Sequence, residues 1–467
     1  MVTDAIVIGG GPAGYVAASR LSQEGLKVCL IERKYLGGEC TNWGCIPSKT
    51  LIEAAHAVSL AKAARQAGIK LKLEELNTSR LMRWVRRVRD RARAAVTQLL
   101  SEVEIVEGVG RVKSPHVVSV KLKDGGVKEI EGRYIVVATG SDPSPVPGFA
   151  FDGRYVLSNR DFFELESLPD SILIIGAGAI GTEIAAALAR LGVKVHLAEI
   201  LDCVLPSYGP RVGELVAKYL RRYGVRIHVS VVAKPLEVGG NGVRVKLLPR
   251  RGGDADEVVV DKVLIAAGRR YLTKGIGLED VGVELGDKGV VIVNEDLRTS
   301  VPTILAAGDV TGPPLLAHKA YREGMIAAET IVRGSSSIPR GPVPAVIFTT
   351  PEVASVGITE EQARRLGLDV RVVRYGYAAL SRDYTVLERT PDGFAEVVLE
   401  KRSNRVLGAL VVGNGAAELI HVLGLAVAAR ISIEEVAKSI CSHPTYSEIV
   451  CELAHKALGR PVHGALH

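Results

Sequence analysis

The run Asp4-Ala-Ile-Val-Ile-Gly-Gly-Gly-Pro-Ala-Gly14 decides the fold of the N-terminal part of the chain. It joins a short apolar strand to a glycine-rich turn, and a helix-like stretch leads on to a second strand at Val28–Glu32. In such a unit Gly9 forms the tight turn, Gly11 lets the backbone approach a pyrophosphate, and Gly14 lets helix and strand pack closely. The helix N-terminus offers free amides and a partial positive charge to the phosphates. The run therefore predicts a dinucleotide-binding unit.

A second copy of the pattern begins at Ile172-Leu-Ile-Ile-Gly-Ala-Gly-Ala-Ile-Gly181, with glycines at Gly176, Gly178 and Gly181. In each copy an acidic residue, Glu32 or Glu199, stands 23 positions after the first glycine. Such an acid accepts hydrogen bonds from a ribose 2′-hydroxyl. A single glycine run of this kind is often only a turn between strand and helix. Because strand, helix and acid recur twice, the sequence predicts two dinucleotide sites.

The second acid also indicates which nicotinamide cofactor is used. A carboxylate at Glu199 would repel a 2′-phosphate, and no arginine follows it before Arg211. NAD is therefore favoured over NADP.

Length and composition are those of a large globular protein. The 467 residues suffice for two to four domains, and 47% are apolar and 24% charged. The net charge of +7 is spread along the chain, except for a basic run at Arg83–Arg93 whose apolar spacing predicts an amphipathic helix with a solvated basic face. No nucleic-acid signature, secretory signal or apolar run of about 20 residues is visible. We expect a cytoplasmic protein without a nucleic-acid or membrane partner.

A close cysteine pair follows the first unit, in Gly37-Gly-Glu-Cys-Thr-Asn-Trp-Gly-Cys-Ile-Pro-Ser-Lys49. On a regular helix, Cα atoms five residues apart lie about 8.6 Å apart, whereas a disulfide needs roughly 4.4–6.8 Å. If Cys40 and Cys45 are bonded, the segment must bend, and Gly44 could permit the bend. A zinc site would need further ligands, but the other four cysteines are scattered singly. On spacing alone, a redox pair and two structural thiols are both open, and we expect no metal.

This cysteine run, following a dinucleotide fingerprint, resembles the redox motif of the class I pyridine nucleotide-disulfide oxidoreductases. Further motifs of that family occur in the same order along the chain, and its members that oxidise dihydrolipoamide match the whole chain best. The matching runs are Ala138-Thr-Gly140, Ala266-Ala-Gly-Arg269, Thr303-Ile-Leu-Ala-Ala-Gly-Asp309, Leu316-Ala-His-Lys-Ala320 and Thr349-Thr-Pro-Glu-Val-Ala-Ser-Val-Gly357.

The resemblance implies an α/β fold with two Rossmann-like domains and an α+β C-terminal dimerisation domain. The implied boundaries are residues 1–148 for an FAD domain, 149–267 for an NAD domain, 268–338 for a central segment that completes the FAD domain, and 339–467 for the interface domain.

A histidine near the C-terminus is the other candidate for chemistry, in His443-Pro-Thr-Tyr-Ser-Glu448. By itself, Thr445-x-x-Glu448 fits the capping box of a helix start. The hexapeptide also resembles the His–Glu dyad of the family, in which the histidine serves the disulfide of the other subunit. His443 would then be the general base, and Glu448 would hold its tautomer and make the ring more basic. This role implies a homodimer.

The resemblance also implies catalytic and cofactor roles for single residues. Cys40 would be the interchange thiol that the substrate attacks, and Cys45 would lie next to the flavin. The residues implied for FAD are Gly9, Gly11, Gly14, Glu32, Lys49, Gly110, Thr139, Gly140, Gly308, Asp309 and Ala317, and those for NAD are Gly176, Gly178, Gly181, Glu183, Glu199 and Gly268. Lys49 and Glu183 form a pair in relatives, although a surface ion pair would explain them equally.

Three positions depart from the family pattern. Cys441 stands where a second histidine is usual, Tyr446 where an aliphatic residue is usual, and Ala179 where a larger residue often covers the flavin. The first two bear on the thiol-binding site.

The leading hypothesis is NAD⁺-dependent oxidation of dihydrolipoyl groups on the lipoyl domains of 2-oxoacid dehydrogenase or glycine cleavage complexes. A reductase of another disulfide and a flavin-bound redox sensor are the alternatives.

Overall fold

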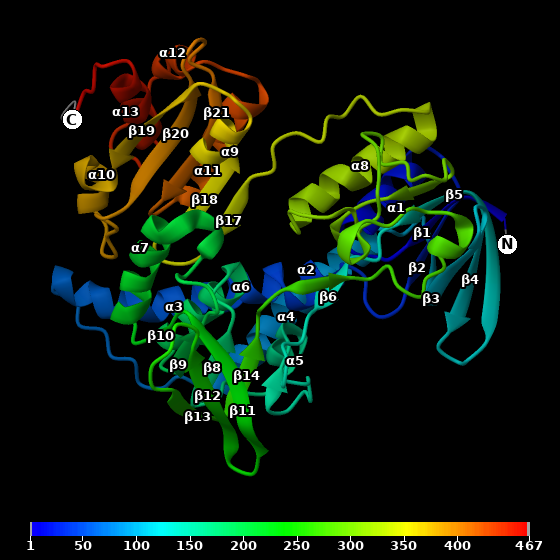
Figure 1. Cartoon of the computed structure of the whole chain (residues 1–467), viewed down its shortest axis with the longest axis horizontal. Helices are drawn as coiled ribbons and strands as arrows, with labels where there is room; N and C mark the ends of the chain where they lie inside the picture. Colours follow the sequence, from blue (N-terminus) through cyan, green and yellow to red (C-terminus); the bar gives the residue numbers. More distant parts are fainter. Residues whose placement is uncertain (1, 465–467) are drawn as a thin grey trace.

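The structure is a computed structural model that describes residues 2–464. It is built from three parts, which we call the first, second and C-terminal units (Figure 1). The first unit carries the N-terminal glycine run, the second carries the repeat of that run, and the C-terminal unit is formed by about the last quarter of the chain. Among the described residues, no helix is long and apolar enough to cross a membrane.

The first unit is organised around a parallel sheet with an antiparallel extension. The strand β1 lies between β2 and β5, and β16 adds to the other side of β5. The strands β3 and β5 run past the parallel part and pair there with β4. The helices α1 and α8 pack against each other on one face of this sheet (Figure 1). Its strands are β1 (Val2–Ile8), β2 (Val28–Glu32), β3 (Glu104–Ser114), β4 (Val117–Leu122), β5 (Val127–Val137) and β16 (Ile304–Ala306), and its helices are α1 (Pro12–Gln23) and α8 (Ala317–Arg333).

The second unit is a fully parallel five-stranded sheet in the order β10-β9-β8-β14-β7, and a three-stranded antiparallel sheet lies beside it. The central strands β8 and β14 are apolar and buried along most of their length, as is typical of parallel strands that are covered on both faces. The parallel strands are β7 (Val156–Leu157), β8 (Ser171–Ile175), β9 (Lys194–Ala198), β10 (Arg226–His228) and β14 (Lys262–Ile265), the antiparallel strands are β11 (Val231–Gly239), β12 (Gly242–Pro249) and β13 (Asp256–Val260), and the helices are α5 (Asn159–Glu164), α6 (Ala179–Arg190) and α7 (Gly209–Arg222).

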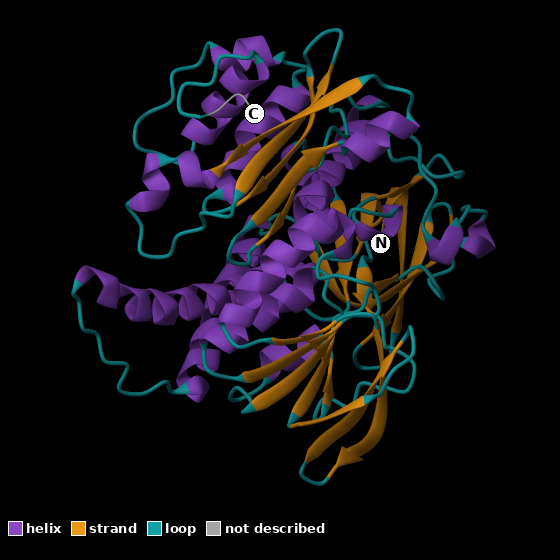
Figure 2. Ribbon diagram, turned by 60° about the vertical axis from the view of Figure 1, so that its left-hand side comes forward, coloured by secondary structure: helices purple, strands orange, loops and turns teal. Residues whose placement is uncertain are grey.

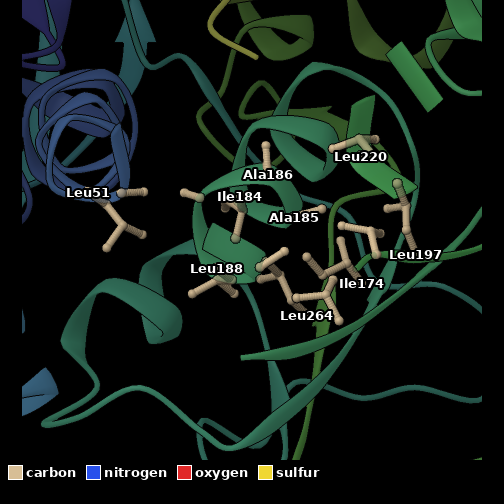
Figure 3. Packing of buried hydrophobic residues seen from close by; sticks show 14 of the residues in the cluster. Leu51, Ile174, Ile184, Ala185, Ala186, Leu188, Leu197, Leu220 and Leu264 are labelled. Carbon is tan, nitrogen blue, oxygen red and sulfur yellow. The ribbon is translucent and has the colours of Figure 1, made fainter. Parts of the chain in front are cut away.

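The helices that follow the cysteine run join the first and second units. The long helix α3 packs against α6, and Figure 3 shows Leu51 of α3 beside Ile184 of α6 within one apolar core. The strands β6 and β15 pair where the chain passes between the two units. The connecting elements are α2 (Gly38–Trp43), α3 (Cys45–Ala63), α4 (Thr78–Leu99), β6 (Ser141–Pro143) and β15 (Arg269–Tyr271).

The C-terminal unit is a five-stranded antiparallel sheet in the order β17-β18-β21-β20-β19, against which α11 and α13 pack (Figure 2). Most residues of the inner strands β20 and β21 are buried and none is exposed. Its elements are β17 (Ala345–Ile347), β18 (Val353–Gly357), α9 (Glu360–Arg365), β19 (Val370–Gly376), α10 (Ser381–Tyr384), β20 (Phe394–Glu400), β21 (Val406–Val412), α11 (Ala416–Ala428), α12 (Ile433–Ala437) and α13 (Glu448–Ala457).

One expectation about surface charge needs correction. The basic run at Arg83–Arg93 does form an amphipathic helix, α4, but its basic face is not wholly solvated. Arg89 is buried, and its Nη1 donates to Glu164 at 2.6 Å. The apolar residues of α4 are also not all buried, because Trp84 remains 37% exposed.

Candidate redox and dinucleotide site

Cys40 and Cys45 form a disulfide across the break between two helices. The helix α2 ends at Trp43, Gly44 has φ −123° and ψ −107°, and α3 begins at Cys45. This break brings the two Cα atoms to 4.8 Å, well below the spacing on a regular helix. The prediction that the segment bends at Gly44 is confirmed.

The residues between the cysteines are held by a network that the sequence did not reveal. Trp43 is buried, and its Nε1 donates to the Glu164 carboxylate at 3.0 Å. The same carboxylate accepts a hydrogen bond from Arg89. Arg93 donates from Nε to Asn42 Oδ1 at 2.8 Å. Because Arg89 and Arg93 lie on α4, the basic helix supports the redox loop.

A cavity of about 650 Å³ opens beside this disulfide. Its wall brings together predicted residues from distant parts of the chain: Gly9, Gly11, Glu32, Cys40, Cys45, Lys49, Thr139, Gly140, Glu183, Gly308, Asp309 and Ala317. A single elongated cavity therefore runs from the first glycine turn to the disulfide. The small side chain of Ala179 and that of Ile180 also line it.

Several predicted residues lie outside that wall. Val109 lines the cavity in place of its neighbour Gly110, and Arg269 lines it next to Gly268. The remaining ones outside it are Gly14, Gly176, Gly178, Gly181, Glu199, His443 and Glu448. The glycines of the second turn therefore do not line this cavity, although Ala179 and Ile180, which directly follow Gly178, do.

The acid of each dinucleotide unit holds its own glycine turn. In the first unit, Glu32 Oε2 accepts a hydrogen bond from the Gly10 N–H at 2.7 Å. In the second, Glu199 Oε2 accepts one from the Ala177 N–H at 2.7 Å, and Oε1 accepts another from the Leu201 N–H at 2.9 Å. The same carboxylate spacing thus gives the same turn twice.

The middle glycines fit a bound dinucleotide. A Cβ added at Gly11 would lie 3.8 Å from the nearest atom, Gly38 Cα, and one added at Gly178 would meet nothing within 4 Å. Both residues have φ −75°, which any residue adopts. The protein itself therefore does not require glycine at either position, whereas a pyrophosphate lying against the backbone does.

Lys49 and Glu183 form the predicted ion pair, and it is more than a surface contact. Lys49 Nζ lies 2.8 Å from Glu183 Oε2, and the Glu183 side chain is only 7% exposed. Its other oxygen accepts a hydrogen bond from the Phe348 N–H at 2.9 Å. The pair therefore joins all three units at the cavity wall.

The turn at Gly308–Asp309 is held by the buried ion pair of Lys319 and Glu323. Glu323 accepts a hydrogen bond from the Gly308 N–H at 2.8 Å, and Lys319 donates to the Gly308 carbonyl at 3.2 Å. Burial lowers the pKa of Lys319 despite its contact with Glu323. Asp309 itself accepts a hydrogen bond from Ser141 at the cavity wall. Sequence reasoning did not assign Glu323, whose spacing of i,i+4 from Lys319 on α8 was the available signal.

The His443–Glu448 dyad lies on the C-terminal unit. His443 Nδ1 lies 2.8 Å from Glu448 Oε1, and Glu448 Oε2 accepts a hydrogen bond from the Thr445 N–H at 2.9 Å. The His443 side chain is 61% exposed. The predicted capping box is only half formed, because α13 begins at Glu448, and Thr445 Oγ1 donates to the Ser442 carbonyl instead.

Two expectations from residue spacing are wrong in tertiary structure. Cys441 and Cys451 are not single cysteines, because they form a second disulfide with Cα atoms 6.4 Å apart. The acid Glu199 is also not remote from every arginine. Arg250 donates to the Ile200 carbonyl at 3.1 Å, and Arg251 pairs with Asp202 at 2.5 Å. Both stand in the turn that follows β12, about fifty positions further along the chain.

A disulfide between two dinucleotide-binding units defines the class of flavin-linked disulfide oxidoreductases. The chain belongs to the pyridine nucleotide-disulphide oxidoreductase family, which matches residues 3–324. Residues 343–454 match the dimerisation domain of that family.

Individual relatives cover nearly the whole chain. Dihydrolipoyl dehydrogenase of Geobacillus stearothermophilus is 37% identical over 99% of this chain and 97% of its own length. That of Bacillus subtilis is 38% identical over 99% and 97%. Among solved structures, LpdA from Mycobacterium tuberculosis has a TM-score of 0.87 at 29% identity, over 97% of this chain and 99% of its own. The flavoprotein disulfide reductase RclA from Escherichia coli has a TM-score of 0.82 at 27% identity, over 97% and 99%.

These matches confirm several predictions. The chain has the predicted fold class, carries out flavin-dependent dithiol/disulfide chemistry, and uses FAD and NAD(H). The resemblance to the members that oxidise dihydrolipoamide is confirmed at full length. The dimerisation domain supports a homodimer.

Proposed function

We propose that this enzyme oxidises dihydrolipoyl groups carried by lipoyl domains of 2-oxoacid dehydrogenase or glycine cleavage complexes, with NAD⁺ as the acceptor. The observation that carries the proposal is the single cavity that runs from the first glycine turn to the Cys40–Cys45 disulfide. The full-length similarity to dihydrolipoyl dehydrogenases supports the substrate class.

The cysteine and histidine residues would carry the thiol chemistry. His443 of one subunit takes a proton from the substrate dithiol, because only a thiolate is nucleophilic. The thiolate attacks Cys40 Sγ, the Cys40–Cys45 bond breaks, and Cys45 leaves as a thiolate. The second substrate thiol then attacks the mixed disulfide and releases Cys40. The substrate is thereby oxidised by two electrons, which the cysteine pair has gained.

Glu448 would keep His443 in the tautomer that accepts this proton. Burial raises the pKa of Glu448, but hydrogen bonds from His443 and the Thr445 N–H outweigh it and hold that pKa below the usual range. The carboxylate is therefore ionised at neutral pH and can stabilise a protonated imidazole.

Residues of the two glycine turns and of the cavity wall would together bind the two dinucleotides. Gly9, Gly11 and Gly14 would hold the FAD pyrophosphate at the N-terminus of α1, and Glu32 its ribose. Bound FAD supplies the two-electron relay between the cysteine pair and NAD⁺. Gly176, Gly178, Gly181 and Glu199 would hold NAD in the corresponding way. The further contacts proposed are Lys49, Gly110, Thr139, Gly140, Gly308, Asp309 and Ala317 for FAD, and Glu183 and Gly268 for NAD.

We propose domain boundaries at residues 148, 267 and 338. The pairing of β6 with β15 supports the first two, because it joins the outgoing and returning chain segments between the first and second units. A stretch without helix or strand between α8 and β17 supports the third.

A comparison of two assays tests the substrate. The purified enzyme should reduce NAD⁺ with dihydrolipoamide far faster than it oxidises NADPH with glutathione disulfide. If glutathione disulfide is the better substrate, the enzyme is instead a reductase of another disulfide.

A mixed dimer tests the shared site. Dimers of two His443→Ala chains or of two Cys45→Ser chains should be inactive. A heterodimer of the two chains retains one intact Cys–His combination and should regain about half of the wild-type rate per dimer. A heterodimer without activity would contradict the assignment of His443 to the other subunit's disulfide.

A further inference from the structure

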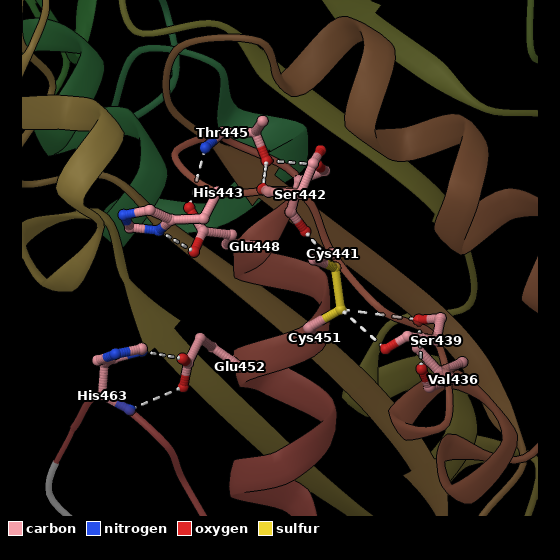
Figure 4. The surroundings of a disulfide bond; sticks show 11 residues. Val436, Ser439, Cys441, Ser442, His443, Thr445, Glu448, Cys451, Glu452 and His463 are labelled. Carbon is pink, nitrogen blue, oxygen red and sulfur yellow. Dashed lines mark hydrogen bonds and ion pairs between the residues drawn. A yellow bond between two sulfur atoms is a disulfide. The ribbon is translucent and has the colours of Figure 1, made fainter.

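The second disulfide encloses the His443–Glu448 dyad. Cys441 precedes the dyad in the segment after α12, and Cys451 follows it in the first turns of α13. The loop that the bond closes therefore contains both members of the dyad. Figure 4 shows the sulfur bridge joining the loop to the helix on which Glu448 stands.

The bridge is seated between two helices. Cys451 is only 9% exposed, and its Sγ lies 3.6 Å from Ser439 Oγ. Ser439 in turn donates to the Val436 carbonyl of α12 at 2.7 Å. The Cys441 Sγ lies 3.5 Å from the Ser447 carbonyl oxygen. These contacts connect α12, the dyad loop and α13 through the two sulfur atoms.

The dyad loop has little packing of its own. Ser442, His443 and Pro444 are exposed, and Ile440 is 99% exposed. Tyr446 packs on the core beside Tyr377, whereas the exposed part of the loop is not fixed by the apolar core and is ordered by local bonds. A covalent link across the loop restricts its conformations directly.

The link bears on the geometry that the dyad needs. His443 approaches Glu448 across five residues of this loop, and their 2.8 Å contact requires the loop to stay folded back on α13. Other titratable groups surround Glu448. Glu452 stands one turn further along α13 and pairs with His463 at 2.7 Å, and Tyr375 of β19 faces the same carboxylates. If the loop moved away from α13, His443 would lose its contact with Glu448.

We propose that Cys441 and Cys451 are positioning residues, and that their disulfide holds His443 and Glu448 in the arrangement needed to deprotonate the substrate thiol. This inference rests on the proposed role of His443 as the base. It gives Cys441, which departs from the family pattern, a purpose different from that of the histidine usually found there.

The covalent link is tested first, on the purified holoenzyme. Alkylation in denaturant without reduction, followed by digestion and mass spectrometry, should label the free thiols Cys29 and Cys203 and yield a peptide linked through Cys441 and Cys451. After reduction with NADH, Cys40 and Cys45 should become alkylated while the Cys441–Cys451 peptide stays linked. Alkylated Cys441 and Cys451 in the untreated enzyme would overturn the proposal.

The positioning role is tested with the double variant Cys441→Ser/Cys451→Ser, and Cys203→Ser serves as the control for loss of a thiol. The double variant should oxidise dihydrolipoamide about ten- to a hundredfold more slowly in kcat, because misplacing a catalytic group by about 1 Å can have an effect of that size. The acid limb of its pH profile should move to lower pH, because a displaced carboxylate no longer favours the protonated imidazole. NADH oxidation with ferricyanide, which needs no thiol base, should stay at the wild-type rate.

The variant His443→Gln separates the two levels of inference. If His443→Gln retains dithiol oxidation, the role of the base itself is wrong. If His443→Gln is inactive but the double serine variant keeps both its rate and its pH profile, the disulfide is only structural and the positioning role is wrong. Loss of the ferricyanide reaction in the double variant would also overturn it, since the damage would then extend beyond the dyad.

Discussion

The first and second units contain the same glycine turn with nearly the same local geometry. The first glycine has φ +106° at Gly9 and +107° at Gly176, where side chains are rarely tolerated. The acids Glu32 and Glu199 each accept a backbone N–H of their turn at 2.7 Å. At this level the two units cannot be told apart.

The surroundings of the two turns differ completely. The first turn lines the cavity that also contains Cys45 and Asp309, whereas the second turn and Glu199 do not. The second unit contributes to that cavity through α5, with Asn159, Arg160 and Phe163, and through the start of α6, with Ala179 and Ile180. The comparison shows that the same local motif can lie in different surroundings, and that these surroundings depend on the elements packed beside the turn.

The largest effect is expected from placing a side chain at the middle glycine of the first glycine turn. In Gly11→Val the side chain would occupy the room that a pyrophosphate needs, so the enzyme should be purified without flavin and should not oxidise dithiols. Flavin absorbance per chain measures this. The control is Gly424→Ala in α11, whose added Cβ would make an ordinary 3.7 Å contact with Val356. A Gly11→Val enzyme with a full complement of flavin would contradict the assignment of the first turn to FAD.

The matching change in the second turn should have a smaller and different effect. Gly178→Val should keep its flavin, while the KM for NAD⁺ rises about ten- to a hundredfold, since overpacking typically costs about 1–3 kcal/mol. Steady-state kinetics and the flavin spectrum check both halves of this prediction. If flavin is lost here too, the two turns do not serve separate cofactors.

Removing the negative charge of Glu199 should have a moderate effect. Glu199→Gln keeps one carbonyl oxygen for the backbone N–H groups but removes the charge, so the KM for NAD⁺ should rise about tenfold, because hydrogen bonds to charged groups contribute about 1.5–3 kcal/mol. The preference for NAD⁺ over NADP⁺ should narrow, because Arg250 and Arg251 lie close by. An unchanged ratio of kcat/KM for the two cofactors would show that Glu199 does not set the preference.

The smallest effect is expected from a contact between α3 and the C-terminal unit. The hydrogen bond that His56 Nε2 on α3 donates to the Glu388 carboxylate raises the pKa of His56 above 6.5. Because the folded-state pKa is raised, this contact stabilises the fold fully below pH 6.5, and its contribution is lost as the pH rises through the raised value. The NMR titration of His56 should have its midpoint above 6.5 in the wild type and lower in Glu388→Gln. Equal midpoints in both proteins would show that Glu388 is not the cause.

The sequence anticipated features that depend on short spacing and missed those that depend on long-range contacts. The bend at Gly44 followed from the distance that a disulfide allows between Cys40 and Cys45. The link between Cys441 and Cys451 was missed, because its formation depends on how α13 packs beside the segment after α12. The burial of Arg89 was missed for the same reason, since Glu164 becomes its partner only after folding.

The sequence by itself determined the two dinucleotide turns, because each is encoded by glycine conformation and residue spacing. Spacing alone left the redox pair and the dyad open, and only the resemblance to the family implied them. Tertiary structure alone decided that the first turn and the disulfide share one cavity, that Lys49 meets a buried Glu183, and that the dyad loop is cross-linked to α13. The physical reason is that burial and pairing depend on which elements pack together, and the packing of distant elements is a property of the whole chain.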